Sequence, residues 1–500
     1  MTSTSTSTST STSTSPSPSP SPSPSSILVS NPNRWKALTI LSLAQFLIIL
    51  DTSIIGVALP SIQEHFGITQ TELQWIFNAY VITFGALLLL GGRLSDILGQ
   101  RKVFTIGFLI LTGASVLAGI AMSNDMLITA RVLQGLGAAL IAPSALSIVM
   151  NLFSANKSEM NKAMGIWGAA APAGGTAGVF LGGIITAWFD WPWVFLINVP
   201  IGIAVLALIP KLIPKGVKKK GSIDYLGALT ITASVGILIY SIVTANENGW
   251  TSIQTTILLS TSTALFVGFI AIEKRSKDPL IPLHIFKIPN LLSSNIVMAL
   301  LGASWVSMWF FLNLYLQQIL HYGPLESGLA LLPMTGLIMM MMTWLMPRLI
   351  GKLGVKENLI VGLGLLTVGL ILFSFIPANS EQGDNNHIFL VYVLPASIIS
   401  ALGMSFSYIP ILVSAISNAR NEDSGITSGL VNTTYQIGSA VGLAILVSLS
   451  TSHSDLLIDI GTNMLEALNQ GFHLAFIGAA IISAIASLTA VSFIRTRPKE

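Results

Sequence analysis

The stretch "ALTILSLAQFLIILDTSIIGVAL", residues 37–59, is an apolar run that contains one charged residue, Asp51. A helix needs about 20 apolar residues to cross the hydrocarbon core of a bilayer, so this run predicts a membrane-spanning helix. A carboxylate inside such a helix is costly and usually functional. Two questions follow: how many runs of this kind the chain has, and what Asp51 does in this one.

The composition indicates an integral membrane protein. Of the 500 residues, 52% are hydrophobic and 9% are charged, whereas an ordinary soluble protein has about 25% charged residues. The net charge of +3 comes from basic residues in short loops, so we exclude nucleic acid as a partner. The chain has no cysteine and only six scattered histidines, so we expect no disulfide, no metal site and no cofactor.

The N-terminal segment has a composition of its own. Ser-Thr repeats and then Ser-Pro repeats fill most of its length, and such repeats cannot bury apolar surface. Residues 1–33 are therefore predicted to be a disordered tail.

Runs long enough to span a membrane recur fourteen times. They lie near residues 37–59, 72–92, 102–121, 126–149, 164–187, 194–210, 225–245, 253–272, 291–319, 325–347, 358–376, 387–413, 424–450 and 472–494.

The basic residues predict the orientation of these spans. If the N-terminus is cytoplasmic, 23 of the 24 Lys and Arg residues fall in the tail, in cytoplasmic loops or at the C-terminus. The remaining one, Arg131, lies inside the fourth run. Because cytoplasmic loops of membrane proteins are enriched in Lys and Arg, both termini of this multi-pass protein are predicted to be cytoplasmic.

A short repeat divides the chain. "LSDILGQR" (94–101) matches "LIGKLGVK" (349–356) at four positions with an offset of 255. Each segment follows the second helix of a six-helix block, which predicts an N-terminal half over 34–210 and a C-terminal half over 273–500. Between them, 211–272 forms a Lys-rich linker and two inserted helices.

Six further motifs carry a family resemblance. They are "LDTSIIGVALPSI", "GRLSDILGQRK", "RVLQGLGAALIAPSAL", "WPWVFLINVPIG", "LQQILHYGPLESGLALLP" and "NTTYQIGSAVG". In this order they resemble the fourteen-span drug:proton antiporter branch of the major facilitator superfamily. The resemblance implies an all-α membrane protein with the major facilitator fold, in which two six-helix halves flank an inserted two-helix hairpin.

The resemblance also implies a function. The expected protein is not an enzyme but a secondary active transporter, working as a monomer in the lipid bilayer of the inner or plasma membrane. It would export small amphipathic organic compounds, such as drugs and organic cations, by proton antiport with alternating access. Two alternatives remain: an exporter dedicated to one metabolite or antibiotic, and a membrane sensor that transports nothing.

Asp51 and Arg131 are the only ionisable residues well inside the fourteen runs. They could pair and merely neutralise each other, although buried pairs stabilise weakly. Alternatively, burial favours the protonated carboxyl group and a nearby Arg favours the ionised one, so a pair that forms in one conformation only would couple proton binding to access. We predict that both residues serve proton coupling and substrate binding.

Polar and aromatic residues inside the runs are candidates for the substrate cavity, with interhelical packing or a lipid-facing belt as the alternative. The candidates are Tyr80, Gln134, Trp305, Trp309, Asn432 and Gln436.

The loop after the second run is predicted to be a latch. In this superfamily such a loop pairs with the neighbouring half and closes the cytoplasmic side. The alternative is that its basic residues only set the orientation. The family has a basic residue directly after the aspartate, where this chain has Ile97. The latch residues are Gly92, Asp96, Gly99, Arg101 and Lys102.

The fifth run carries a glycine pattern resembling the antiporter signature, in Gly174, Gly178, Gly182 and Gly183. Small residues four apart let helices approach closely. The family signature has a proline where this chain has Val179, a departure that bears on proton antiport rather than on transport.

Overall fold

The computed structural model describes residue 2 and residues 33–153, 156–214, 224–276, 279–281, 283–378, 385–416 and 424–495, and the regular elements within these ranges are helices. The N-terminal bundle contains α2 (Arg34–Phe66), α3 (Gln70–Leu98), α4 (Gln100–Gly119), α5 (Asn124–Phe153), α6 (Lys157–Phe189), α7 (Trp193–Leu196) and α8 (Asn198–Leu212). A hairpin follows, formed by α9 (Tyr225–Asn248) and α10 (Ile253–Arg275).

The C-terminal bundle begins after a short 3₁₀ turn, η1 (Leu283–Lys287). Its helices are α11 (Leu291–Leu314), α12 (Pro324–Met340), α13 (Met346–Leu353), α14 (Val355–Phe373), α15 (Asn385–Ile388), α16 (Leu394–Ile416), α17 (Ser424–Asp459) and α18 (Met464–Phe493). Three π-helical segments continue or precede these helices: η2 (Tyr315–Ile319), η3 (Met341–Leu345) and η4 (Phe389–Val393).

The structure agrees with fourteen spans. Thirteen helices of the described chain are long and apolar enough to cross a membrane. The predicted second span lies within α3, whose 29 residues reach about 43 Å at 1.5 Å per residue. The predicted fold class is therefore confirmed.

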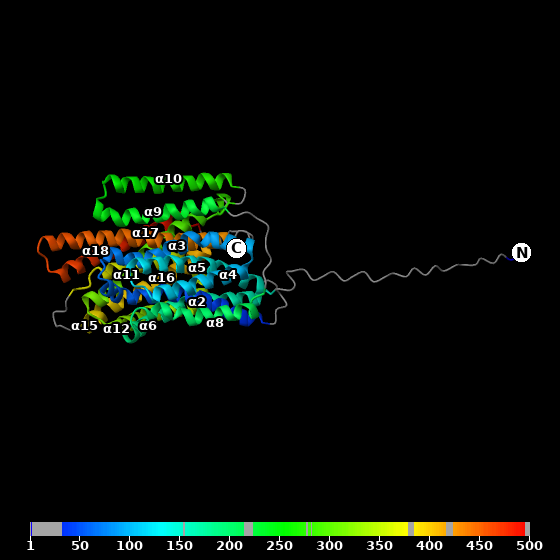
Figure 1. Ribbon diagram of the computed structural model, residues 1–500, viewed down its shortest axis with the longest axis horizontal. Helices are drawn as coiled ribbons and strands as arrows, with labels where there is room; N and C mark the ends of the chain where they lie inside the picture. Colours follow the sequence, from blue (N-terminus) through cyan, green and yellow to red (C-terminus); the bar gives the residue numbers. More distant parts are fainter. Residues whose placement is uncertain are drawn as a thin grey trace.

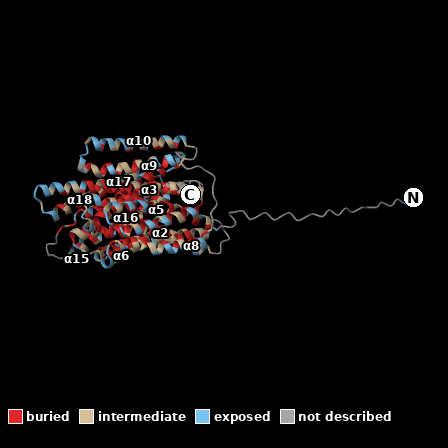
Figure 2. Ribbon diagram, in the orientation of Figure 1, coloured by how far each residue is buried: buried red, intermediate tan, exposed pale blue. Residues whose placement is uncertain are grey.

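The two bundles pack separately and meet along two seams. In the N-terminal bundle, α2 packs on α6, and α5 packs on α3 and α4; in the C-terminal bundle, α14 packs on α16, and α11 on α17 and α18. Between the bundles, α6 packs on α12 and α3 packs on α17. Buried residues concentrate in the centre of the molecule, and the exposed ones face outward (Figure 2).

The α9–α10 hairpin lies at the outer edge of the molecule (Figure 1). Helix α9 packs on α3 and on α17, whereas α10 packs mainly on α9. Ser234 and Ser262 each donate a hydrogen bond to the other's carbonyl oxygen, at 2.9 and 2.8 Å, and so tie the hairpin together. The hairpin therefore covers the α3–α17 seam from outside.

The sequence repeat recurs as a repeated turn. Gly99 joins α3 to α4 with φ +97°, and Gly354 joins α13 to α14 with φ +96°. Only glycine adopts such values readily, so both sharp turns require it. Helix α2 begins and α18 ends at one end of the bundle, on the right in Figure 1. We call it the terminal end, and the opposite one the distal end.

Candidate functional site

The two intramembrane charges meet. Asp51 lies in the middle of α2 and Arg131 lies in α5. Arg131 Nη1 donates to Asp51 Oδ2 at 2.7 Å, and both side chains have 0% exposure. The pair lies inside the N-terminal bundle, where α2 packs on α5.

Further amides complete the surroundings of Asp51. Its Oδ1 accepts from Asn198 Nδ2 at 2.6 Å and from Gln134 Nε2 at 3.2 Å. Gln134 also donates to Ser115 Oγ at 2.9 Å and accepts from Arg131 at 2.9 Å. We call Asp51, Arg131, Gln134, Asn198 and Ser115 the polar cluster.

The guanidinium of Arg131 is held on other sides too. Its Nε donates to the carbonyl oxygen of Ile76 in α3 at 3.0 Å. Its Cζ lies 4.4 Å from the ring centre of Tyr80 and 5.8 Å from that of Phe195, which are cation–π distances. The contacts of Asp51 and Arg131 thus connect α2, α3, α5, α7 and α8.

The side chain of Asp51 accepts hydrogen bonds at both of its oxygens. Three donors point at these two oxygens: Arg131, Gln134 and Asn198. Removing one member of a buried ion pair costs about 3–5 kcal/mol. Loss of either charged partner alone is therefore expected to destabilise the N-terminal bundle.

The sequence candidates for the substrate cavity fall into two groups. Tyr80 and Gln134 are completely buried and belong with the polar cluster. Trp309 and Gln436 lie where the bundles meet: a methyl group at Gly56 would lie 3.0 Å from Trp309 Nε1, and one at Gly85 would lie 2.6 Å from Gln436 Cβ.

The other two candidates belong to the C-terminal bundle. Tyr408 donates to Asn432 Oδ1 at 3.4 Å, and Trp305 is partly buried against the core. The role of all six residues in a substrate cavity stays a prediction.

The predicted latch has a defined turn. Gly99 occupies it with positive φ, Gly92 is partly buried, Arg101 is half-buried and Lys102 is exposed. The side chain of Asp96 lies outside the described part of the structure. The closing role of this loop also stays a prediction.

The glycines of α6 serve two contacts. Methyl groups at Gly178 and Gly182 would lie 2.9 Å from the carbonyl oxygens of Leu50 and Ile54 in α2, and Gly174 meets the same helix. These three glycines therefore permit the close α2–α6 packing that their spacing predicts. Gly183 points elsewhere, to the opposite bundle.

Gly183 meets Gly328 of α12 at the α6–α12 seam. A methyl group at Gly183 would lie 2.8 Å from the carbonyl oxygen of Pro324 and 3.3 Å from Gly328 Cα. One at Gly328 would lie 2.9 Å from the carbonyl oxygen of Val179, the residue that replaces the family's proline. The two helices thus touch backbone to backbone here.

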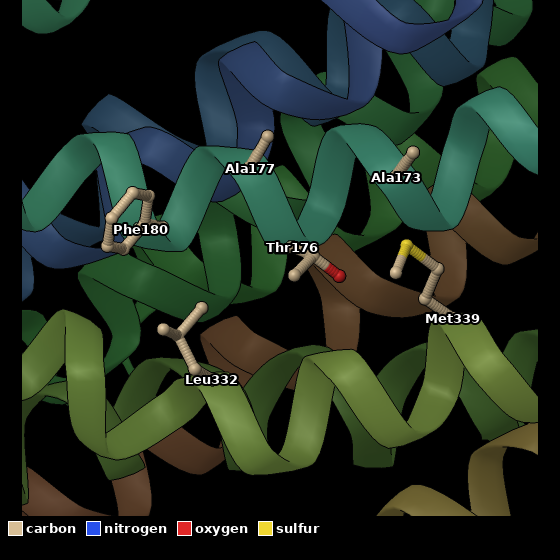
Figure 3. Close-up of a pocket in the computed structure, with 6 residues that line it drawn as sticks. All are labelled: Ala173, Thr176, Ala177, Phe180, Leu332 and Met339. Atoms are coloured by element: carbon tan, nitrogen blue, oxygen red, sulfur yellow. The ribbon is translucent and has the colours of Figure 1, made fainter.

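An apolar groove of about 330 Å³ follows the same seam (Figure 3). The hydroxyl of Thr176 donates to the carbonyl oxygen of Thr335 across the seam at 3.2 Å. The lining residues are Ala173, Thr176, Ala177, Phe180, Leu332 and Met339.

Glutamines close the distal end between α2 and η2. Gln318 Nε2 donates to Gln63 Oε1 at 2.9 Å, and Gln317 Nε2 donates to the carbonyl oxygen of Val57 at 3.0 Å. Gln63 and Gln318 are 255 positions apart, the offset of the sequence repeat, so equivalent residues of the two bundles bond to each other.

Sequence reasoning missed Asn198 and the two glutamines. Asn198 lies in "WPWVFLINVPIG", and Gln317 and Gln318 lie in "LQQILHYGPLESGLALLP". The presence of an amide side chain within an apolar motif could have identified all three as candidates. The break between α7 and α8, which starts α8 at Asn198, was not predicted.

Two helical bundles around buried intramembrane charges are the architecture of a secondary transporter. The family model of the Major Facilitator Superfamily matches residues 41–443. The chain belongs to this superfamily and is a multi-pass membrane transporter, not an enzyme.

Curated relatives cover most of the chain. It is 34% identical over 461 residues to the cephamycin export protein CmcT of Amycolatopsis lactamdurans, covering 91% of this chain and 92% of the relative. It is 32% identical over 465 residues to the puromycin resistance protein pur8 of Streptomyces alboniger, covering 92% and 91%. The multidrug resistance protein Stp of Mycobacterium tuberculosis is 30% identical, covering 83% and 76%.

Solved structures share the fold. An auto-inhibited POT family peptide transporter superposes with a TM-score of 0.66 at 17% identity, covering 93% of this chain and 99% of that chain. The human organic anion transporter MFSD10 has a TM-score of 0.57 at 15% identity, covering 92% and 100%.

Proposed function

We propose that the protein exports small amphipathic organic compounds, including drugs or antibiotics, in exchange for protons through alternating access of its two bundles. The three relatives described above are named for export of, or resistance to, such compounds. The family places the chain among transporters; the direction, the substrate and the driving ion are part of the proposal.

The Asp51–Arg131 ion pair is the observation that carries proton coupling. The pair is fully buried, with its atoms 2.7 Å apart, and two amides hold the second carboxylate oxygen. Hydrogen-bond donors therefore occupy both oxygens of Asp51 in this conformation, in which the distal end is closed. A rearrangement that moves α2 relative to α5 or α8 would withdraw donors and allow a proton to bind.

The roles follow from these contacts. Asp51 binds the proton, Arg131 competes with it, and Gln134 and Asn198 hold the carboxylate in place. An organic cation entering the cavity could compete with the proton through the charge of Asp51. The carbonyl oxygen of Val179 lies at Gly328, on the α6–α12 seam.

Flux in proteoliposomes tests the function. Purified protein is reconstituted with a fluorescent lipophilic cation such as ethidium, and a pH gradient is imposed in either direction. We expect uphill movement that reverses with the gradient and stops when a protonophore collapses it. Movement that ignores the gradient would rule out proton antiport, and an absence of movement with a panel of drugs would favour the sensor alternative.

A dedicated exporter is the second candidate. CmcT and pur8 are each named for one antibiotic, whereas Stp is named for several drugs. Drug susceptibility of a deletion strain separates the two cases: loss of resistance to one compound indicates a dedicated exporter, and loss to several unrelated compounds indicates a multidrug exporter.

The terminal end is proposed to face the cytoplasm because the basic loops lie there. The protein is further proposed to act as a monomer, since each chain has both bundles and a complete polar cluster.

A further inference from the structure

Two buried amides in α3 have no hydrogen-bond partner among the described residues. Gln74 is 1% exposed and Asn78 is 0% exposed. Neither the oxygen nor the nitrogen of either amide makes a hydrogen bond there. Buried polar groups in proteins are almost always paired, so four unmet atoms in neighbouring turns require an explanation.

Both amides lie on the face of α3 that meets α17. Gly85 marks this face, because a methyl group there would lie 2.6 Å from Gln436 Cβ and 3.6 Å from the carbonyl oxygen of Thr433 in α17. Asn78 is seven residues before Gly85, nearly two full turns, and Gln74 is one turn further. The ring centres of Trp75, on the neighbouring face of α3, and Tyr240 of α9 lie 6.2 Å apart. The α9–α10 hairpin therefore covers α3 at the level of Gln74.

The position along α3 is also informative. The helix begins at Gln70, at the distal end, so both amides lie in its first turns, near the level of the glutamine contacts between α2 and η2. At the other seam, Gly183 and Gly328 bring two backbones into contact at this end.

We propose that Gln74 and Asn78 bias the transporter toward opening its distal end. Closure of the α3–α17 seam removes both amides from water without giving them partners, which costs free energy. Separation of the bundles at this end exposes the amides to water or to the polar groups of a passing compound. The amides thus destabilise the sealed state and stabilise the open one.

The inference rests on the alternating access proposed above, but its test needs neither substrate nor a proton gradient. The chain has no cysteine, so two introduced cysteines carry spin labels at defined positions. Glu64→Cys on α2 and Asp455→Cys on α17 are exposed sites near the distal ends of the two bundles. Pulsed electron paramagnetic resonance in nanodiscs then gives the populations of short and long distances.

Apolar substitutions of similar size provide the comparison. Gln74→Met and Asn78→Leu, together and singly, remove the unmet polar atoms. We expect the ratio of open to sealed populations to fall on the order of tenfold in the double variant, with smaller decreases in the single variants. The matched control is Asn469→Leu, another buried amide, which lies within the C-terminal bundle and away from the seam. Its nitrogen donates to the carbonyl oxygen of Ile376, and its oxygen has no partner among the described residues.

The outcomes are separable. If any folded variant of Gln74 or Asn78 keeps the open population of the parent, or raises it, the inference is wrong; should the double variant not fold, the single variants decide. An equal decrease in Asn469→Leu would also overturn it, because the effect would not belong to the seam. A parent chain that never shows the long distance would instead overturn the alternating access beneath it.

Discussion

A methyl group at Gly183 should open the distal end. In the sealed state its carbon would lie 2.8 Å from the carbonyl oxygen of Pro324, 3.2 Å from Leu325 Cα and 3.3 Å from Gly328 Cα. Ordinary contacts begin at 3.4 Å, so the helices must separate by about 0.6 Å, the difference between 3.4 and 2.8 Å. The opposing atoms are mainly backbone, and no side chain can turn away to make room.

Overpacking of this kind costs about 1–3 kcal/mol. The cost falls on the sealed state alone, because the open state separates α6 from α12. At about 1.4 kcal/mol per factor of ten, Gly183→Ala should lower the ratio of sealed to open populations roughly 5-fold to 150-fold.

The assay uses the absence of natural cysteines. Val57→Cys places a thiol where the side chain is 0% exposed, beside the Gln317 contact. Its alkylation by a membrane-impermeant maleimide reports opening of the distal end. Gly168→Ala is the matched control on the same helix: no atom lies within 4 Å of its new methyl group, while the gain in helix propensity, up to about 1 kcal/mol, is the same.

We expect alkylation in Gly183→Ala to be faster than in the control by the factor given above. Equal rates in the two variants would show that the α6–α12 contact does not hold the distal end closed.

Three other perturbations have defined outcomes. Asn198→Leu removes the amide that donates to Asp51 Oδ1 at 2.6 Å and should lower the free energy of unfolding by about 1.5–3 kcal/mol. The measurement is thermal unfolding in detergent beside the parent protein, and an unchanged midpoint would contradict the assigned contact. Gly99→Ala forces a side chain into positive φ at a cost of about 1–3 kcal/mol. It should lower the unfolding midpoint, whereas Gly168→Ala should not. Glu273→Ala removes the carboxylate that accepts hydrogen bonds from the backbone N–H groups of Leu280 and Ile281 at 3.2 and 3.0 Å. Hydrogen exchange of these two amides should accelerate about tenfold or more. Unchanged protection of both amides would contradict the assigned contacts.

Sequence reasoning predicted the fold because its determinants are local. Long apolar runs and basic loops define the spans without any knowledge of their packing, and Gly99 and Gly354 mark the repeat because both turns need positive φ. The same reasoning could not predict the π-helical segments, which arise where a helix adapts to its neighbours. The lack of a hydrogen-bond partner for Gln74 among the described residues could not be predicted either, because the sequence of an apolar run does not show which residues of other helices face a given side chain.

The site was predictable in part for the same reason. Asp51 and Arg131 stood out because charges are rare inside spans, and the structure brings them together. Asn198 did not stand out, since a neutral amide near a span end is common, and only the structure shows that it donates to Asp51. Tyr80 and Gln134 were predicted only as candidates for the substrate cavity, whereas the structure encloses both beside Arg131.

The most direct test of the central claim separates coupling from movement. Asp51→Asn, which keeps the shape but not the charge, is reconstituted in proteoliposomes beside the parent chain. The account predicts that the variant loses uphill transport driven by a pH gradient while it retains downhill exchange of the same fluorescent cation. Uphill transport by Asp51→Asn at the parent rate would contradict the assignment of proton coupling to this residue.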